Sequence, residues 1–306
     1  MSDVVVVTGA GGFAGSHLVE HLLASQADRN GADGPRIIGW TRETVDLLDR
    51  DAVRAAIRET RPSQIYHCAG IPHQAESWRD TARPLEGNVL ATEHLFDALR
   101  REGIRCRVLI PGSAALYAPS SEPIVESDPI APASPYAISK LAQEQLALRA
   151  IREDGLDVVV TRSFNHTGPR QQPAFVAPSL ARQIALIERG RLEPVIKVGN
   201  LEARRDLTDV RDVVRAYAAL MESGETGGIY NVASGVARSI RAVLDALVAR
   251  STVRVRIEVD ETRMRPNDVP ILVGSYARLN QATGWRPEIS FDRMLDDLLS
   301  YWRAVA

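Results

Sequence analysis

The first half of the chain alternates short apolar runs with longer stretches in which apolar residues recur every three or four positions. Continuously apolar runs are typical of strands buried on both faces of a parallel sheet. The stretches between them are typical of helices with one buried face. The expected strands are residues 4–8, 36–40, 64–67, 108–111 and 158–162, and the expected helices are residues 14–24, 51–60, 85–101 and 134–152. This repetition predicts an α/β fold, a doubly wound parallel sheet with helices on both faces.

The pattern changes after residue 165. Residues 165–174 contain two prolines and a glycine and are predicted to form a loop. Helices are then expected at 178–189, 210–223, 239–249 and 291–303, and strands at 194–198, 228–233 and 253–259. We expect these elements to form a smaller α/β C-terminal domain, residues 166–306, packed at the carboxyl ends of the strands, where such sheets bind ligands. Whether the chain crosses back between residues 1–165 and this domain stays open.

The composition excludes several classes of protein. With 306 residues, 45% hydrophobic and 25% charged, the chain is long enough for one large or two ordinary globular domains. Its formal net charge of −2 offers no basic surface for nucleic acid. No apolar run approaches the roughly 18 residues that span a bilayer, and no basic segment precedes the first strand, so no membrane span and no signal peptide are expected. Two cysteines do not make a disulfide framework, and the expected location is cytoplasmic.

A glycine-rich turn joins the first expected strand to the first expected helix. Its glycines stand at positions 9, 12 and 15. Gly9 permits a tight turn, Gly12 lets a pyrophosphate approach the backbone, and Gly15 allows the helix to pack closely on the strand. The helix N-terminus then faces the anion, with Phe13 and Ala14 beside it. Residues 1–165 are therefore predicted to be a dinucleotide-binding Rossmann domain.

The end of the second expected strand bears on the choice of dinucleotide. NAD enzymes usually place Asp or Glu there for the ribose 2′-hydroxyl, whereas this chain has Thr41 followed by Arg42. Because a guanidinium suits a 2′-phosphate, NADP(H) is favoured and NAD(H) remains open. The other residues expected to contact the cofactor are Asp46 and Leu47 near the adenine, and Cys68, Ala69 and Gly70 near the nicotinamide.

Tyr136 and Lys140 stand four positions apart at the start of an expected helix, which puts both side chains on one face. A nearby ammonium favours the phenolate and brings the pKa of a tyrosine toward neutral pH, where the phenol can act as a general acid or base. The chain has only two lysines, Lys140 and Lys197. Ser113 follows the fourth expected strand and can present its hydroxyl at the same edge of the sheet. We therefore expect Ser113, Tyr136 and Lys140 to be catalytic.

The glycine turn, Ser113, Tyr136 and Lys140 occur in the order of the extended short-chain dehydrogenase/reductase family, which the chain resembles over essentially its whole length in its nucleotide-sugar branch. Within that branch, residues 162–169, 198–206 and 263–270 look like the GDP-4-keto-6-deoxy-mannose reductases. GDP-mannose 4,6-dehydratases are the nearest relatives of that group.

This resemblance implies NAD(P)H-dependent reduction of the C4 keto group of a GDP-4-keto-6-deoxyhexose, in deoxysugar biosynthesis. It implies that residues 166–306 bind a nucleotide sugar, and that the protein is a homodimer. It also implies the roles of six residues. Asn165 donates to the diphosphate, Arg205 and Arg265 neutralise phosphates, Phe175 and Val176 line the nucleotide cleft, and Asn200 lies near the base.

Several alternatives stay open on the residues alone. Dehydratases of this family carry Asp or Glu directly after the catalytic Ser or Thr, where this chain has Ala114 and Ala115. Alanine cannot do acid–base work, so a GDP-mannose 4,6-dehydratase is the less favoured reading. The related reductases often carry an acid here as well, and a nucleotide-sugar 4-epimerase needs only the Ser–Tyr–Lys set. A non-catalytic NADP(H)-binding redox sensor is the alternative outside enzymes. The His-x-x-Glu-His pattern at residues 17–21 is explained by the helix after the glycine turn, so no metal is expected.

Overall fold

A six-stranded parallel sheet forms the centre of the computed structural model, which describes residues 3–28, 34–264 and 269–306. Its strand order is β10-β5-β4-β3-β1-β2, so the chain runs outward from β1 in one direction and then in the other. The strands are β1 (Val4–Thr8), β2 (Arg36–Trp40), β3 (Gln64–His67), β4 (Arg107–Ser113), β5 (Asp157–Ser163) and β10 (Ile229–Val232). The predicted doubly wound parallel sheet is confirmed.

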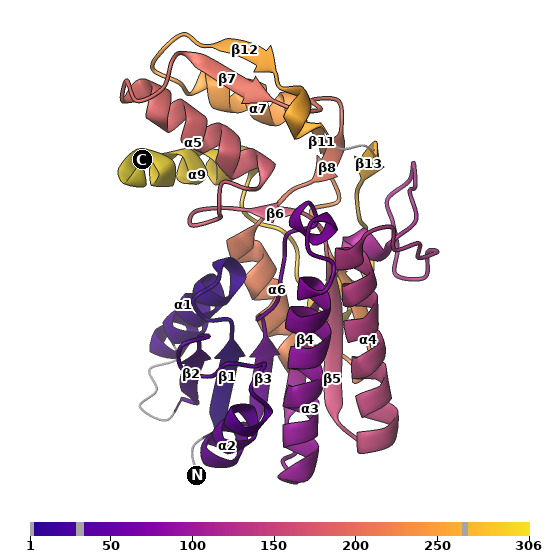
Figure 1. Ribbon diagram of the computed structural model, residues 1–306. Coiled ribbons are helices and arrows are strands. Elements are labelled where there is room, and N and C mark those ends of the chain that lie inside the picture. The colour runs from indigo at the N-terminus through magenta and orange to yellow at the C-terminus, as the bar shows by residue number, and fades with distance from the viewer. Residues whose placement is uncertain (1–2, 29–33, 265–268) are drawn as a thin grey trace.

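Helices cover both faces of this sheet (Figure 1). On one face, side chains such as Val6 and Ile110 pack against α2, α3 and α4, and on the other Val5 and Leu109 pack against α1 and α6. Neighbouring strand residues thus serve opposite cores, which is why these strands are apolar throughout. The helices are α1 (Phe13–Asp28), α2 (Arg50–Thr60), α3 (Ala91–Arg101), α4 (Pro135–Asp154) and α6 (Val210–Ser223), with short helical turns η1 (Glu76–Trp78), η2 (Leu85–Leu90) and η3 (Ala114–Leu116).

The chain crosses back into the sheet after residue 165. Helix α6 packs against α1, and β10 pairs in parallel with β5 at the edge of the sheet. A single division at residue 165 therefore does not separate the two parts of the structure, because residues 210–232 and 277–283 also belong to the larger one.

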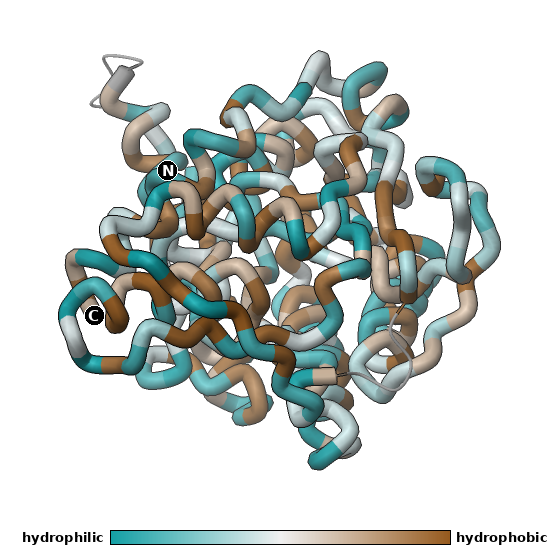
Figure 2. Tube along the Cα trace, turned by 90° about the horizontal axis from the view of Figure 1, so that it is seen from above, coloured by the Kyte–Doolittle hydropathy of each residue, from teal (hydrophilic) through white to brown (hydrophobic). Residues whose placement is uncertain are grey.

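The smaller part lies above the carboxyl ends of the central strands (Figure 1). Helices α5, α7 and α9 share one apolar core with β7. Viewed from above, hydrophobic and hydrophilic stretches alternate along the tube, as helices with one buried face require (Figure 2). The elements of the smaller part are α5 (Val176–Glu188), β7 (Val195–Val198), β8 (Arg204–Asp206), β11 (Ala237–Ser239), α7 (Ile240–Ala249), β12 (Arg256–Val259), η4 (Glu261–Arg263), β13 (Ile271–Leu272) and α9 (Phe291–Val305), with β6 (His166–Thr167) and β9 (Thr208–Asp209) pairing below them. Helix α8 (Ala277–Thr283) packs against α6 and β10 and so belongs to the larger part.

Most predicted elements are present, with ends shifted by a few residues. The helix predicted at 85–101 opens with the π-helical turn η2 before α3 begins. The loop predicted at 165–174 contains the two-residue strand β6. The prediction missed α8 and the short strands β8, β9, β11 and β13. These strands have two or three residues each, which is too short to show a hydrophobic period.

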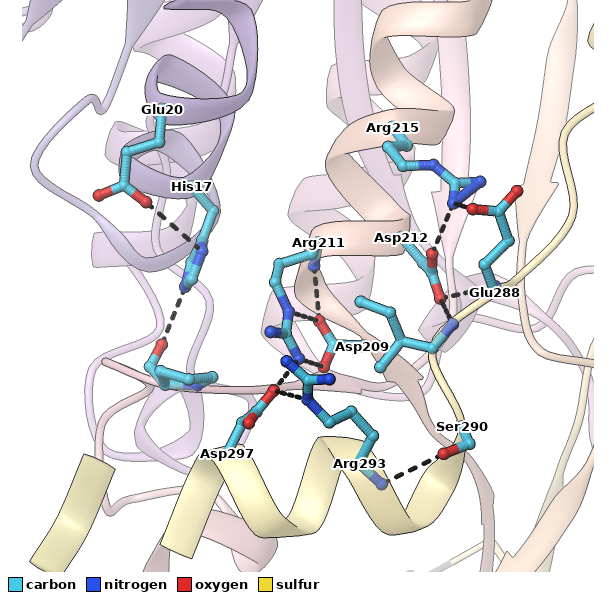
Figure 3. Close-up of polar contacts among 12 residues, drawn as sticks. His17, Glu20, Asp209, Arg211, Asp212, Arg215, Glu288, Ser290, Arg293 and Asp297 are labelled. Atoms are coloured by element: carbon cyan, nitrogen blue, oxygen red, sulfur yellow. Dashed lines mark hydrogen bonds and ion pairs between the residues drawn. The ribbon is translucent and has the colours of Figure 1, made fainter. Parts of the chain in front are cut away.

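Carboxylates at the start of α6 tie the two parts together (Figure 3). Asp212 is fully buried and accepts from Arg215 and from the backbone N–H groups of Glu288 and Ile289, just before α9. Arg211 pairs with Asp209 at 2.7 Å and with Asp297 of α9 at 2.7 Å. Within the described ranges no helix is long and apolar enough to span a bilayer.

We expect Gly15→Ala to lower the free energy of unfolding by about 3 kcal/mol, because a Cβ at Gly15 would lie 2.1 Å from Gly9 O. Gly11→Ala, in the same turn, is the matched control: its nearest neighbour would be 3.6 Å away, so its effect should stay within about 0.5 kcal/mol. Urea denaturation measures both values. Equal losses in the two variants would contradict close helix–strand packing at Gly15.

Candidate active site

Strand β4 ends at Ser113, at the carboxyl edge of the sheet. Strands β4 and β5 approach closely here, since a Cβ on Gly112 would lie 2.2 Å from Thr161 O. Ser113 is 8% exposed and caps η3, where its Oγ accepts from Ala115 N–H at 3.2 Å. The hydroxyl therefore lies at the carboxyl edge of the sheet.

Helix α4 begins at the place that brings Tyr136 to this edge. Ser134 caps the helix by accepting from Ala137 N–H, and Pro135 occupies the first helical position, where its missing N–H costs nothing. Tyr136 thus lies in the first turn, with its own N–H donating to Ser77 Oγ at 3.3 Å. Burial raises the pKa of the Tyr136 phenol, and a hydrogen bond with the Ser113 side chain lowers it. Tyr136 and Ser113 therefore lie at the same edge of the sheet.

Lys140 lies one turn further along α4 and is 8% exposed. Its Nζ donates to Pro111 O of β4 at 2.6 Å and to Gln143 Oε1 at 2.5 Å. Burial lowers the pKa of this ammonium to about 8. The sequence analysis expected the ammonium to lower the pKa of Tyr136. In this structure burial instead raises the pKa of Tyr136, and the opposing contribution comes from Ser113, while the ammonium donates to Pro111 O and Gln143.

The glycine turn has the shape of a cradle for a phosphate group. Gly9 has φ of 66°, and a Cβ there would lie 2.7 Å from Ala69 N, so the turn touches the segment after β3. Gly12 N–H donates to Gly9 O at 2.8 Å, and α1 begins at Phe13. The first N–H groups of a helix have no partner inside it and attract anions. These residues fit the pyrophosphate of a dinucleotide.

A cavity of about 520 Å³ opens over this turn. It brings three predicted cofactor residues, Gly12, Phe13 and Gly70, together with the predicted substrate residue Phe175. The Phe175 ring stacks on His73 with centroids 4.9 Å apart. The other lining residues are Gly11, Ser16, Ile71, Pro72, Glu76, Arg83, Arg170, Gln171 and Gln172. None of these nine is among the predicted site residues, and for Arg83, Arg170 and Gln172 no motif distinguishes the side chain from that of a solvated loop residue.

One short segment connects the cavity by hydrogen bonds to Tyr136, one of the three predicted catalytic residues. His73 lines the cavity, its carbonyl accepts from Ser77 N–H, and Ser77 Oγ accepts from Tyr136 N–H. Ser113, Tyr136 and Lys140 are not part of the cavity lining and lie beyond this segment, at the ends of β4 and α4.

The residues expected around the adenosine lie at the end of β2. Thr41 borders the turn, since a Cβ on Gly11 would contact its methyl group at 3.6 Å. The Arg42 side chain is 77% exposed, with Asp46 at 3.8 Å as an ion-pair partner. Leu47 is buried, and its carbonyl accepts from His94.

The other expected substrate residues spread over the smaller part. Asn165 is exposed after β5, and its carbonyl accepts from Thr208 N–H. Val176 is the exposed first residue of α5. Asn200 follows β7, and Arg205 lies on β8 between β11 and β13. The sixth expected residue, Arg265, lies outside the described residues.

The His-x-x-Glu-His pattern serves as an attachment between α1 and the loop after β6 (Figure 3). His17 Nε2 lies 2.9 Å from Pro169 O, and burial lowers the pKa of this imidazole. Glu20 accepts from Arg170 at 2.7 Å. In the part of the chain that the structure describes, no group of three His, Cys, Asp or Glu residues could hold a metal ion.

Comparisons with known proteins extend over nearly the whole chain. Residues 6–298 match the model of the family described as GDP-mannose 4,6 dehydratase. The chain is 37% identical to the GDP-6-deoxy-D-mannose reductase of Pseudomonas aeruginosa, over 99% of this chain and 98% of that protein.

Two solved structures show the same fold. RMD from Pseudomonas aeruginosa, complexed with NADPH, has a TM-score of 0.89 and 36% identity, covering 99% of this chain and all of that one. UDP-glucose 4-epimerase from Thermus thermophilus, in complex with NAD, has a TM-score of 0.86 and 28% identity, covering 99% of each chain. The resemblance inferred from the motifs is confirmed, and the chain belongs to the GDP-mannose 4,6-dehydratase family of the extended short-chain dehydrogenases/reductases.

Proposed function

We propose that this protein reduces the C4 keto group of a GDP-4-keto-6-deoxyhexose with NAD(P)H. The observation that carries the proposal is the placement of a phenol, a hydroxyl and a buried ammonium at the sheet edge that also holds the phosphate cradle. The similarity to a GDP-6-deoxy-D-mannose reductase over 99% of the chain supports the choice of substrate.

Each of the predicted site residues has its own role in the proposed reduction. The glycine turn and the start of α1 hold the dinucleotide, and a reduced nicotinamide supplies the hydride when it is bound. Tyr136 donates its phenolic proton to the oxygen that becomes an alkoxide at C4. Ser113 donates a hydrogen bond to the same oxygen, which stabilises its developing charge. Lys140 has a third N–H beyond the two already donated, and this N–H would donate to a ribose hydroxyl of a bound cofactor.

Reduction is favoured over dehydration by the residues that follow Ser113. Elimination of water across C5 and C6 needs groups that move protons, and Ala114 and Ala115 provide none. The 4-epimerase remains the second candidate, because a UDP-glucose 4-epimerase shares the fold at a TM-score of 0.86. The two activities differ in stoichiometry: a reductase consumes one NAD(P)H per product, whereas an epimerase regenerates its cofactor.

We further propose that NADP(H) is preferred. The end of β2 has no carboxylate for a ribose 2′-hydroxyl, and the highly exposed Arg42 is free to turn toward a 2′-phosphate at the cost of a weak 3.8 Å ion pair. The NADPH bound to the RMD structure supports this preference.

We also propose a homodimer that buries the outer face of η2 and α4. Leu85 and Leu90 of η2 are 45% and 43% exposed, and Ile138 of α4 is 51% exposed. Helix α4 packs against η2, so these side chains belong to adjoining helical segments. Exposed apolar groups gathered in this way mark protein interfaces.

Replacing Tyr136 with Phe should lower kcat by about 100- to 10,000-fold, because the proton donor is lost while the ring remains. Tyr301→Phe on α9 is the matched control and should retain full activity. The assay follows NADPH oxidation with GDP-4-keto-6-deoxy-mannose and identifies the product. Reduction by Tyr136→Phe at the normal rate would defeat the assignment, and product formed without net NADPH consumption would favour the epimerase.

Arg42→Ala should raise the KM for NADPH by about 10- to 100-fold and leave the KM for NADH nearly unchanged, because one charged contact to the 2′-phosphate is lost. Arg36→Ala is the control, since Arg36 is an exposed arginine at the opposite end of the same strand. Equal changes for both cofactors would show that Arg42 does not select the phosphate.

The full-length protein should have twice its chain mass of 33.5 kDa by light scattering. Ile138→Glu should give monomers, because a carboxylate cannot be buried without a partner. Leu23→Glu on α1, where Leu23 is also 51% exposed, should remain dimeric. A dimer that survives Ile138→Glu would place the interface elsewhere.

A further inference from the structure

A buried row of neutral polar side chains lies behind the ammonium of Lys140. Gln143 Nε2 donates to Thr92 Oγ1 at 2.8 Å, and the same oxygen lies 2.9 Å from His67 Nε2. His67 Nδ1 lies 2.9 Å from Thr8 Oγ1. The four side chains that continue the row from Lys140 come from α4, α3, β3 and β1, and none is more than 1% exposed.

The direction of each hydrogen bond follows from counting protons. Thr92 donates its one hydroxyl proton to Asn88 O at 2.7 Å, because a carbonyl can only accept. Thr92 Oγ1 must therefore accept from both Gln143 and His67. Since the amide nitrogen of Gln143 faces Thr92, its amide oxygen faces Lys140 and accepts from the ammonium at 2.5 Å.

The same count assigns the tautomer of His67. Its Nε2 carries the proton that it donates to Thr92, and burial with the nearby Lys140 lowers the pKa of His67 to about 3, so the ring is neutral and Nδ1 accepts from Thr8. Thr8 Oγ1 accepts in turn from Ala69 N–H at 3.1 Å, in the segment that touches the glycine turn. The row of side chains thus runs from the phosphate cradle to the ammonium, and the donor and the acceptor of each of its hydrogen bonds are assigned.

We propose that Thr92, His67 and Gln143 are positioning residues for Lys140: the row holds the amide oxygen of Gln143 toward the ammonium and so directs the third N–H of Lys140 to the cofactor. The inference deepens the proposed reductase function, on which the role of Lys140 rests. Without Thr92 Oγ1 the amide of Gln143 has no fixed orientation, and its NH₂ group can turn toward the ammonium.

The charge on Lys140 depends on this orientation. An accepting oxygen stabilises the ammonium, whereas burial destabilises it. Loss of the acceptor therefore lowers the pKa of Lys140 further below its usual value. The titratable groups that face the ammonium are His67 of β3, Cys68 just after it and Tyr136 of its own helix. Burial raises the pKa of the Cys68 thiol to about 12 and raises that of Tyr136, so the thiol, the phenol and the imidazole are all neutral at pH 8.

The chain allows a direct measurement, because Lys140 and Lys197 are its only lysines. Full-length protein labelled with ¹³C-lysine gives two side-chain Cε signals to titrate by NMR. The exposed Lys197 is the internal control, and Lys197→Arg assigns the signals. The variants are Thr92→Val, which is isosteric but has no acceptor, Thr92→Ser, which keeps the hydroxyl, and Gln143→Met, which removes the amide.

We expect the pKa of Lys140 to fall by about half a unit to one unit in Thr92→Val and Gln143→Met, and to stay at the wild-type value in Thr92→Ser. In the reductase assay, the alkaline limb of the kcat profile should move to lower pH by the same amount in the first two variants only.

An unchanged pKa of Lys140 in folded Thr92→Val and Gln143→Met would overturn the inference, as would an equal shift in Thr92→Ser. If Thr92→Val does not fold, Gln143→Met decides alone. A wild-type protein that does not reduce the keto sugar would defeat the proposed function, whereas the titration would still test the positioning of Lys140.

Discussion

The charge of Lys140, buried at the carboxyl edge of the sheet, is the constraint around which this structure is arranged. A buried ammonium is costly unless its protons are accepted, and here one acceptor comes from β4 and another from a side chain of α4. The second acceptor is oriented by Thr92 of α3 and His67 of β3. The sheet, the helices on one of its faces and the catalytic edge are therefore coupled through one polar group, and a rearrangement of any of them would leave a proton unpaired.

The fold of the first half could be predicted because each strand is buried on both faces and each helix on one. Val5 and Val6 serve opposite cores, so the run around them is apolar without alternation. Strands such as β8 (Arg204–Asp206) could not be predicted, because their stability comes from partners far away in the chain. For the same reason the site could be predicted only in part. The spacing of Tyr136 and Lys140 lies within one helix and is visible in the sequence, whereas the contact of Thr92 with His67 joins residues 25 positions apart.

Buried carboxylates, besides a small apolar cluster that includes Phe164 and Leu272, fix the smaller part of the chain to the sheet. Asp212 accepts from two backbone N–H groups that precede α9, so the last helix is held at its entry point. Asp206 plays a similar part at the other end, accepting from the Ser234 and Gly235 backbone near β10. Removing one partner from such a site leaves an unpaired buried charge, so these contacts hold the smaller part in place above the glycine turn.

Which reaction a protein of this fold catalyses depends on very few side chains. A dehydratase, an epimerase and a reductase can share the cradle, the phenol and the ammonium, and differ in which further protons the site can move. Ala114 and Ala115 follow Ser113 in η3, and Ala114 is only 2% exposed, so neither a carboxylate nor room for one exists at Ala114 without repacking. In the proposed mechanism, the proton donor is then Tyr136, with no carboxylate at Ala114 or Ala115 beside it. A carbonyl reduction needs one proton delivered to oxygen and one hydride delivered to carbon. The proposed site residues provide for these two transfers and for no further proton transfer.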